Sequence, residues 1–86
     1  MTITVYSKSN CVACDSTYRK LDKHGVPYSV VNIEEDAEAL AFARGLDPTY
    51  SAAPIVHVQF ADGTDKHWSG YRDEAINALV KAKEAA

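Results

Sequence analysis

The chain has 86 residues, of which 47% are hydrophobic, and its formal net charge at pH 7 is −3. This composition predicts one globular domain, 1–86, with a core that needs no stabilising disulfides, while the acidic balance, with no visible cluster of lysine and arginine, disfavours nucleic-acid binding. No stretch is apolar enough to predict a membrane span and no leader-like segment opens the chain, so we expect a cytoplasmic protein.

The first part of the chain is typical of a strand, a helix and a second strand. Residues 2–6 are good strand formers that alternate in character, which predicts the first strand. Asn10 is the expected N-cap of the helix that follows. The buried face of this helix has the spacing i, i+4, i+7 and consists of Cys14, Tyr18 and Leu21. Residues 28–33 form the second expected strand, which runs parallel to the first because a whole helix separates the two.

The second part predicts a helix, a β-hairpin and a last helix. The acidic residues 34–36 suit a helix N-terminus, and the helix after them has the buried face Ala39, Phe42, Ala43 and Leu46. Residues 55–60 alternate as a third strand, and Asp62-Gly63 predicts a hairpin to an antiparallel fourth strand at 64–68. An amphipathic helix is expected from Tyr71 onward. The order is βαβαββα, an α/β fold with a four-stranded mixed sheet and three helices.

The two cysteines carry the clearest chemical signal. Cys11 and Cys14 are the only cysteines, and they are spaced C-x-x-C at the start of the first predicted helix. The positive end of a helix dipole stabilises a thiolate over a thiol, which makes the sulfur nucleophilic near neutral pH. We expect Cys11, at the exposed end, to attack a substrate disulfide. Cys14, one turn deeper, would then displace the substrate and leave an oxidised pair.

Other interpretations of the cysteine pair are weaker. A disulfide closing so small a ring would contribute only about 2 kcal/mol, so a structural staple is disfavoured. A zinc site needs four ligands, and the remaining candidates are His24, His57 and His67, with no second clustered pair. Two unrelated buried cysteines would make the spacing accidental. In a reducing compartment, C-x-x-C near a βαβ pattern favours redox chemistry.

Features beyond the cysteines point to a family. C-x-x-C at the first strand-to-helix turn, followed by an x-Pro that opens a hairpin, resembles the thioredoxin fold in its short glutaredoxin-type form. The closest resemblance is to the NrdH redoxins, glutaredoxin-like proteins with thioredoxin-like activity that donate electrons to class Ib ribonucleotide reductase. It extends over nearly the whole chain and is carried by Cys11-Val12-x-Cys14, Thr17, Leu21-Asp22-Lys23, Gly25-Val26, Ala53-Pro54 and His67-Trp68-Ser69-Gly70-Tyr71.

The resemblance implies roles for particular residues. Pro54 would match the family's cis-proline, which leaves the backbone of Ala53 free to pair with an extended substrate segment. Residues 68–71 would form a loop beside the active site, where a true glutaredoxin holds glutathione. For Lys8 three interpretations stay open: it favours the Cys11 thiolate, it grips a substrate carboxylate, or it is an ordinary solvated lysine. The expected substrate-binding residues are Lys8, Val12, Ala13, Ala53, Pro54, Trp68, Ser69, Gly70 and Tyr71.

The function implied is that of a thiol–disulfide oxidoreductase. Thioredoxin reductase would reduce it with electrons from NADPH, and it would pass them to the disulfide of the ribonucleotide reductase large subunit. We expect a monomer with no bound cofactor and no metal. One alternative is a glutathione-dependent glutaredoxin that uses Lys8, Ala53-Pro54 and Asp73 to hold the tripeptide. Another is a module that binds zinc or an iron–sulfur cluster through Cys11 and Cys14.

Some positions depart from the family pattern. Ala13 stands where many members have glutamine, and Asp15 follows Cys14 directly. A carboxylate so close opposes thiolate formation even though it suits a helix N-terminus, so the reduction potential is expected to differ. The connection 47–53 is also longer than usual. His57 alternates with strand residues and is expected to be an exposed or satisfied sheet position, not a catalytic base.

Overall fold

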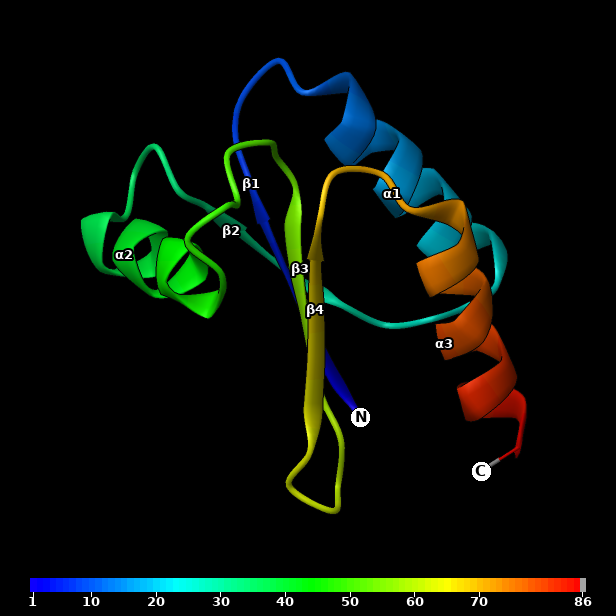
Figure 1. The fold of residues 1–86 in the computed structure, drawn as a ribbon. Coiled ribbons are helices and arrows are strands. Elements are labelled where there is room, and N and C mark those ends of the chain that lie inside the picture. Colours follow the sequence, from blue (N-terminus) through cyan, green and yellow to red (C-terminus); the bar gives the residue numbers. More distant parts are fainter. Residues whose placement is uncertain (86) are drawn as a thin grey trace.

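A mixed β-sheet forms the centre of the molecule (Figure 1). The structure is a computed structural model and describes residues 1–85. Within this range the strands are β1 (Thr2–Ser7), β2 (Ser29–Asn32), β3 (Ile55–Gln59) and β4 (Asp65–Ser69), and the helices are α1 (Val12–Lys23), α2 (Ala37–Leu46) and α3 (Asp73–Ala85). The strand order in the sheet is β2-β1-β3-β4. The predicted order βαβαββα and the four-stranded mixed sheet are confirmed.

The sheet register gathers several chain segments at one end of the molecule. β1 and β2 are parallel, with Ser7 opposite Asn32, whereas β3 is antiparallel to β1, with Tyr6 opposite Ile55. β4 returns antiparallel to β3 and places Ser69 opposite Ile55. The end of β1, the start of β3 and the end of β4 therefore share one end of the sheet, as Figure 1 shows. The loops that leave or enter these strands meet there.

The core lies between the sheet and two helices, α1 and α3, which cover the same face (Figure 1). Alternate residues of β1 and β3 point to this face and pair across the strands, Val5 with Val56 and Ile3 with Val58. Leu21 from α1 and Ile76 from α3 are fully buried against them. No helix in residues 1–85 has the length and apolar character to cross a membrane.

Helix α2 covers the opposite face and buries less than its sequence suggested. Ala43 is its one buried residue within the described chain, whereas Phe42 is 50% exposed. The prediction that Phe42 is buried was wrong, and Ala39 and Leu46, which were expected on the same buried face, are only half-buried. The sheet face under α2 carries Tyr6 and His57 beside the aliphatic Ile55. The Phe42 ring rests against their rings, with centroids 5.9 and 5.6 Å away, and its other side meets solvent.

The β3–β4 hairpin also carries an internal polar pair on the α2 side. His57 is buried, and its Nε2 lies 2.9 Å from Asp65 Oδ2 across the hairpin. The expectation of a satisfied sheet position is thus confirmed. Beside it, Tyr50 Oη lies 2.7 Å from His67 Nδ1 and donates to the His67 carbonyl at 3.1 Å. Tyr50 in this way ties the long 47–53 connection to β4.

The strand and helix ends differ from the expected ones by one residue in several places. β2 is shorter than 28–33, and β4 is shifted by one residue from 64–68. α1 begins after Cys11, so the prediction that Asn10 is its N-cap was wrong. An N-cap residue needs extended backbone, whereas Asn10 has a φ of 55°, the left-handed conformation that asparagine tolerates. Asn10 turns the chain, and Cys11, with φ −116° and ψ 103°, caps the helix.

Tyr28, which directly precedes β2 and packs against the core, provides a test of the packing. The Tyr28 hydroxyl donates to Asp22 Oδ1 at 3.0 Å, and its ring stacks on Tyr18. Burial, and then the Asp22 carboxylate, raise the pKa of Tyr28 to about 12. An unfolded tyrosine ionises near pH 10, so the stabilisation from Tyr28 is complete below about pH 10 and is lost as the pH rises through about 12.

We therefore expect the stability advantage of the wild type over Tyr28→Phe to shrink between pH 10 and pH 12. The phenylalanine variant lacks the titrating group, so its stability should fall less steeply over this range. Urea unfolding of both proteins at half-unit pH steps measures the difference. Parallel curves across the range would show that Tyr28 ionises at its ordinary pH.

Candidate active site

The two cysteines form a disulfide at the N-terminus of α1. Cys11 is the N-cap and Cys14 lies in the first turn, with their Cα atoms 5.2 Å apart. The backbone N–H of Cys14 donates to Cys11 Sγ at 3.1 Å. The sulfur thus takes the place that a serine or aspartate oxygen has in an ordinary helix cap. A negative charge on this sulfur would face the positive end of the helix.

The two sulfurs differ in exposure less than the sequence suggested. Cys14 is 1% exposed and Cys11 is 8% exposed, so both are buried in the oxidised protein. The expected order is right, but Cys11 does not stand at an open rim. Its Sγ is turned inward to the helix end, and the adjacent Val12 takes the outward position, 81% exposed. Thr17, fully buried, donates its hydroxyl to the Ala13 carbonyl at 2.9 Å and holds the first turn.

The loop before β3 lies at the same end of the sheet. The Ala53–Pro54 peptide bond is cis, as the resemblance implied. Two contacts from the end of β4 fix this loop: Ser69 Oγ donates to the Ala52 carbonyl at 2.5 Å, and the Gly70 N–H donates to the Pro54 carbonyl at 2.7 Å. Within residues 1–85 the backbone of Ala53 makes no hydrogen bond, so it is free to pair with a ligand.

The four residues 68–71 do not form one loop. The register of the hairpin carries β4 as far as Ser69, so Trp68 and Ser69 belong to the strand. Trp68 is buried in the hydrophobic core and not at the surface of the protein. Gly70 has a φ of 82°, which suits glycine, and turns the chain out of the sheet. Tyr71 is 40% exposed and is the aromatic side chain of this stretch that reaches the surface.

The loop before Cys11 is held by an acidic residue that the sequence did not single out. Glu34 Oε1 accepts a hydrogen bond from the Ser9 N–H at 2.7 Å. This N–H is the main reason that the pKa of Glu34 is lowered, and the nearby Lys8 ammonium adds to the effect. Lys8 itself is exposed and lines a cavity of about 120 Å³ together with Arg44 and Ala53. Of the acidic residues 34–36, Asp36 caps α2 as expected.

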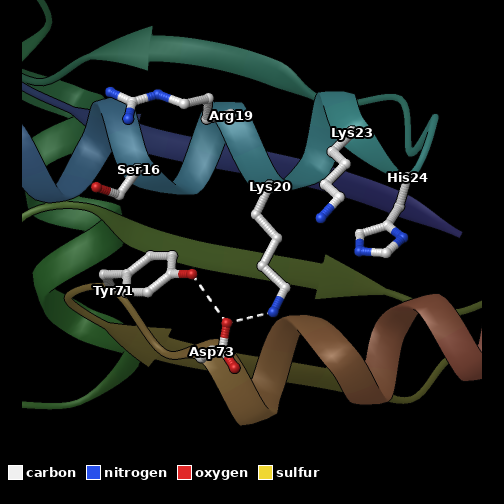
Figure 2. Close-up of a pocket in the computed structure, with 7 residues that line it drawn as sticks. All are labelled: Ser16, Arg19, Lys20, Lys23, His24, Tyr71 and Asp73. Atoms are coloured by element: carbon white, nitrogen blue, oxygen red, sulfur yellow. Dashed lines mark hydrogen bonds and ion pairs between the residues drawn. The ribbon is translucent and has the colours of Figure 1, made fainter.

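Asp73, at the start of α3, already has hydrogen-bond partners within this chain. Its Oδ1 accepts hydrogen bonds from the Tyr71 hydroxyl, at 2.9 Å, and from the Lys20 ammonium, as Figure 2 shows. Its Oδ2 accepts from Asn77 at 3.3 Å. The Lys20 ammonium is the main reason that the pKa of Asp73 is lowered, so the carboxylate is ionised at neutral pH. Lys20 comes from α1, so this ion pair links the two helices.

The histidines named as zinc ligands are placed elsewhere. His57 is paired with Asp65, and His67 with Tyr50, on the sheet face under α2, whereas His24 is the C-cap of α1, at the other end of that helix from the cysteines. In the part of the chain that the structure describes, no three histidine, cysteine, aspartate or glutamate side chains are grouped to hold a metal ion.

The fold and the cysteine pair together define a thiol–disulfide oxidoreductase of the thioredoxin fold. The family model for glutaredoxin matches residues 3–56. The chain is 31% identical over 86 residues to the glutaredoxin-like protein NrdH of Escherichia coli (strain K12), covering 100% of this chain and 98% of the relative. It is 33% identical over 88 residues to that of Salmonella typhimurium, with the same coverage. The chain belongs to the glutaredoxin family, as an NrdH-type redoxin.

Solved structures agree with this assignment. The NrdH-redoxin of Escherichia coli superposes with a TM-score of 0.77 at 29% identity, covering 92% of this chain and 95% of that one. A glutaredoxin from Archaeoglobus fulgidus superposes with a TM-score of 0.71 at 28% identity, covering 91% and 84% of the two chains. The resemblance found in the sequence is confirmed, and so is the thioredoxin-like fold.

The exposed carboxylate of Asp15, next to the cysteine pair, allows a test of how charge at the N-terminus of α1 affects Cys11. Asp15 lies in the first turn of α1. Its charge opposes a thiolate on Cys11, so Asp15→Asn should increase the thiolate fraction of the reduced protein at neutral pH. A charge at about 6 Å in a watery environment changes that equilibrium by about threefold. Alkylation of Cys11 by iodoacetamide at low salt is therefore expected to be faster by about this factor.

Glu84→Gln is the matched control, because it removes the same charge from the far end of α3. It should leave the alkylation rate unchanged. Equal rates for Asp15→Asn and the wild type would mean that the carboxylate does not act on the sulfur.

Proposed function

We propose that this protein carries electrons from thioredoxin reductase, supplied by NADPH, to the disulfide of the large subunit of class Ib ribonucleotide reductase. The main support is the position of Cys11. Its sulfur caps α1 at the end of the sheet where the free backbone of Ala53 enters β3. A disulfide-containing segment that pairs with Ala53 would bring its sulfurs to this helix end.

The exchange itself follows from the two cysteine positions. The Cys11 thiolate attacks one sulfur of the substrate disulfide, which forms a mixed disulfide and releases the other sulfur as a thiolate. The Cys14 thiolate then attacks Cys11 Sγ, breaks the mixed disulfide and releases the second substrate sulfur. Two electrons and two protons pass to the substrate, and the Cys11–Cys14 disulfide remains. The reductase restores the dithiol by the reverse exchange.

The surface around the sulfurs supplies the remaining contacts. Val12 and Ala13 would pack against the substrate next to Cys11, and Tyr71 would border it on the side of α3. Pro54, Ser69 and Gly70 would shape the segment that pairs with substrate backbone. Lys8 would hold a substrate carboxylate. Trp68 acts from the core, by supporting this surface and not by contacting the substrate.

Asp73 favours a protein partner over glutathione. The glutaredoxin alternative needs this carboxylate to receive the amino group of the tripeptide. In this chain Lys20 and Tyr71 already occupy it. The solved relative from Escherichia coli is described as having a thioredoxin-like activity profile. We propose that the protein acts as a monomeric single domain in the cytoplasm, where reducing conditions keep its dithiol available.

The cysteine roles lead to opposite expectations for two variants. Cys11→Ser should abolish reduction of insulin disulfides, because the attacking sulfur is gone. Cys14→Ser should still attack but cannot resolve, so mixed disulfides should accumulate on non-reducing gels and by mass spectrometry. Mixed disulfides on Cys11→Ser and none on Cys14→Ser would reverse the two roles.

The electron donor is tested by NADPH consumption with insulin as the substrate. Thioredoxin reductase should support steady turnover. Glutathione with glutathione reductase should give no more than the Cys11→Ser control, because Asp73 is occupied. Turnover in the glutathione arm alone would establish the glutaredoxin alternative.

A further inference from the structure

A groove between α1 and the start of α3 gathers positive charge (Figure 2). It has a volume of about 410 Å³, and its lining includes Ser16, Arg19, Lys20, Lys23, Tyr71 and Asp73. Besides His24, three lysine and arginine side chains here face one acidic side chain, although the chain as a whole has a net charge of −3. All three come from α1, and the β4–α3 connection closes the other side of the groove with Tyr71 and Asp73.

The basic residues share one face of α1. Ser16, Arg19, Lys20 and Lys23 have the spacing i, i+3, i+4, i+7, which places them on the side of the helix that borders α3. The helix dipole favours cations in the last turn, which accounts for Lys20 and Lys23. It does not account for Arg19, which lies before that turn, or for the gathering of all three side chains at one groove.

The acidic residue of the groove, Asp73, already has a positively charged partner in the same chain. Lys20 pairs with Asp73, and Figure 2 shows Arg19 and Lys23 on either side of Lys20 along α1. Among residues 1–85, neither Arg19 nor Lys23 makes an ion pair. Two positive charges are therefore left for a ligand that the chain does not itself provide.

The groove adjoins the disulfide. Val12, next to Cys11, is one helical turn before Ser16 and is the most exposed of the large hydrophobic residues described. On the other side, Tyr71 follows Gly70, whose N–H is bonded to the Pro54 carbonyl. A partner that places its disulfide against Cys11 therefore has flanking residues within reach of the groove.

We propose that this groove receives an acidic segment of the disulfide partner, with carboxylates beside Arg19 and Lys23. The proposal rests on the proposed function for the kind of partner. Arg19 and Lys23 are separated by a rise of about 6 Å along the helix, and alternate residues of an extended chain are about 6.7 Å apart. Figure 2 shows the charged groups of Arg19 and Lys23 pointing in different directions, so two separate carboxylates of an extended segment suit them better than one compact phosphate does. The net negative charge of the chain also disfavours a nucleic acid.

Charge complementarity of this kind mainly changes the rate of association. It raises the rate at which a matching partner docks, by tenfold or more at low salt. Because Arg19 and Lys23 are exposed, salt screens them, and the Debye length is only about 3 Å at 1 M. A strong loss of rate with added salt is therefore the signature of docking in this groove.

The first test is single-turnover reduction of two disulfide-bridged peptides by the pre-reduced full chain. The peptides differ only in a flanking Glu-x-Glu-x-Glu or Gln-x-Gln-x-Gln segment. The glutamate peptide should be reduced roughly tenfold faster at low salt, and the two rates should converge in 1 M NaCl. Equal rates at low salt would overturn the proposal.

Charge-neutralising variants separate the groove from overall charge. Arg19→Gln combined with Lys23→Gln should remove most of the advantage of the glutamate peptide and leave the glutamine peptide unaffected. Lys66→Gln combined with Lys81→Gln changes the net charge equally at exposed positions outside the groove and should keep the advantage. An equal loss in both double variants would assign the effect to net charge and refute the groove.

A binding experiment tests the groove independently of the proposed electron-transfer function. A cysteine-free Glu-x-Glu-x-Glu peptide is titrated into the oxidised, ¹⁵N-labelled protein. Amide shifts are expected at 16–23 and 71–73, and they should disappear in high salt. Shifts confined to other elements would contradict the proposal. So would the same shifts from inorganic phosphate at lower concentration than the peptide.

Discussion

The contact between the Cys14 N–H and Cys11 Sγ organises the local structure as well as the chemistry. A helix N-terminus presents N–H groups without intrahelical partners, and some acceptor must meet them. Here the acceptor is the sulfur that is also the proposed nucleophile. The cap requires extended backbone at Cys11, and the left-handed turn at Asn10 directs the chain out of β1 into that position. Glu34, from the segment after β2, fixes this turn by bonding the Ser9 N–H.

The same end of the sheet forms the surface that we propose for a partner. β3 starts where β1 ends, so the cis Ala53–Pro54 segment enters the sheet beside the helix cap. β4 ends there too and bonds this segment through Ser69 and Gly70. The 47–53 connection is long, but the Tyr50 hydroxyl holds it against His67. A long loop can hold its backbone in a fixed position when hydrogen bonds anchor it at several points. The extra length of this connection therefore leaves the backbone of Ala53 well ordered.

Local patterns in the sequence were sufficient for the order of elements and the cysteine pair. Strand alternation, helical spacing and the Asp62-Gly63 turn act over a few residues, so they can be recognised without the fold. The missed features depend on contacts between distant residues: Glu34 with Ser9, Tyr50 with His67, and Lys20 with Asp73. Phe42 was placed wrongly because helical spacing shows which residues share a face but not what that face meets. The cis bond at Pro54 was available only through the family resemblance.

The contact between Lys20 and Asp73 bears on both proposals made for this protein. The carboxylate lies at the first turn of α3, where a negative charge is favourable whatever its partner. Because Lys20 reaches it from α1, an incoming ammonium group must displace an ammonium that is already bound, and it must also compete with the Tyr71 hydroxyl. Specificity is a difference between affinities. The Lys20 ammonium therefore lowers the affinity of Asp73 for a small amine ligand and leaves unchanged the affinity for a partner that binds elsewhere. The same ion pair neutralises the one acid of the groove and leaves Arg19 and Lys23 with a net positive charge. Lys20 thus supports both the proposed preference for a protein partner over glutathione and the proposed docking of a carboxylate-bearing segment.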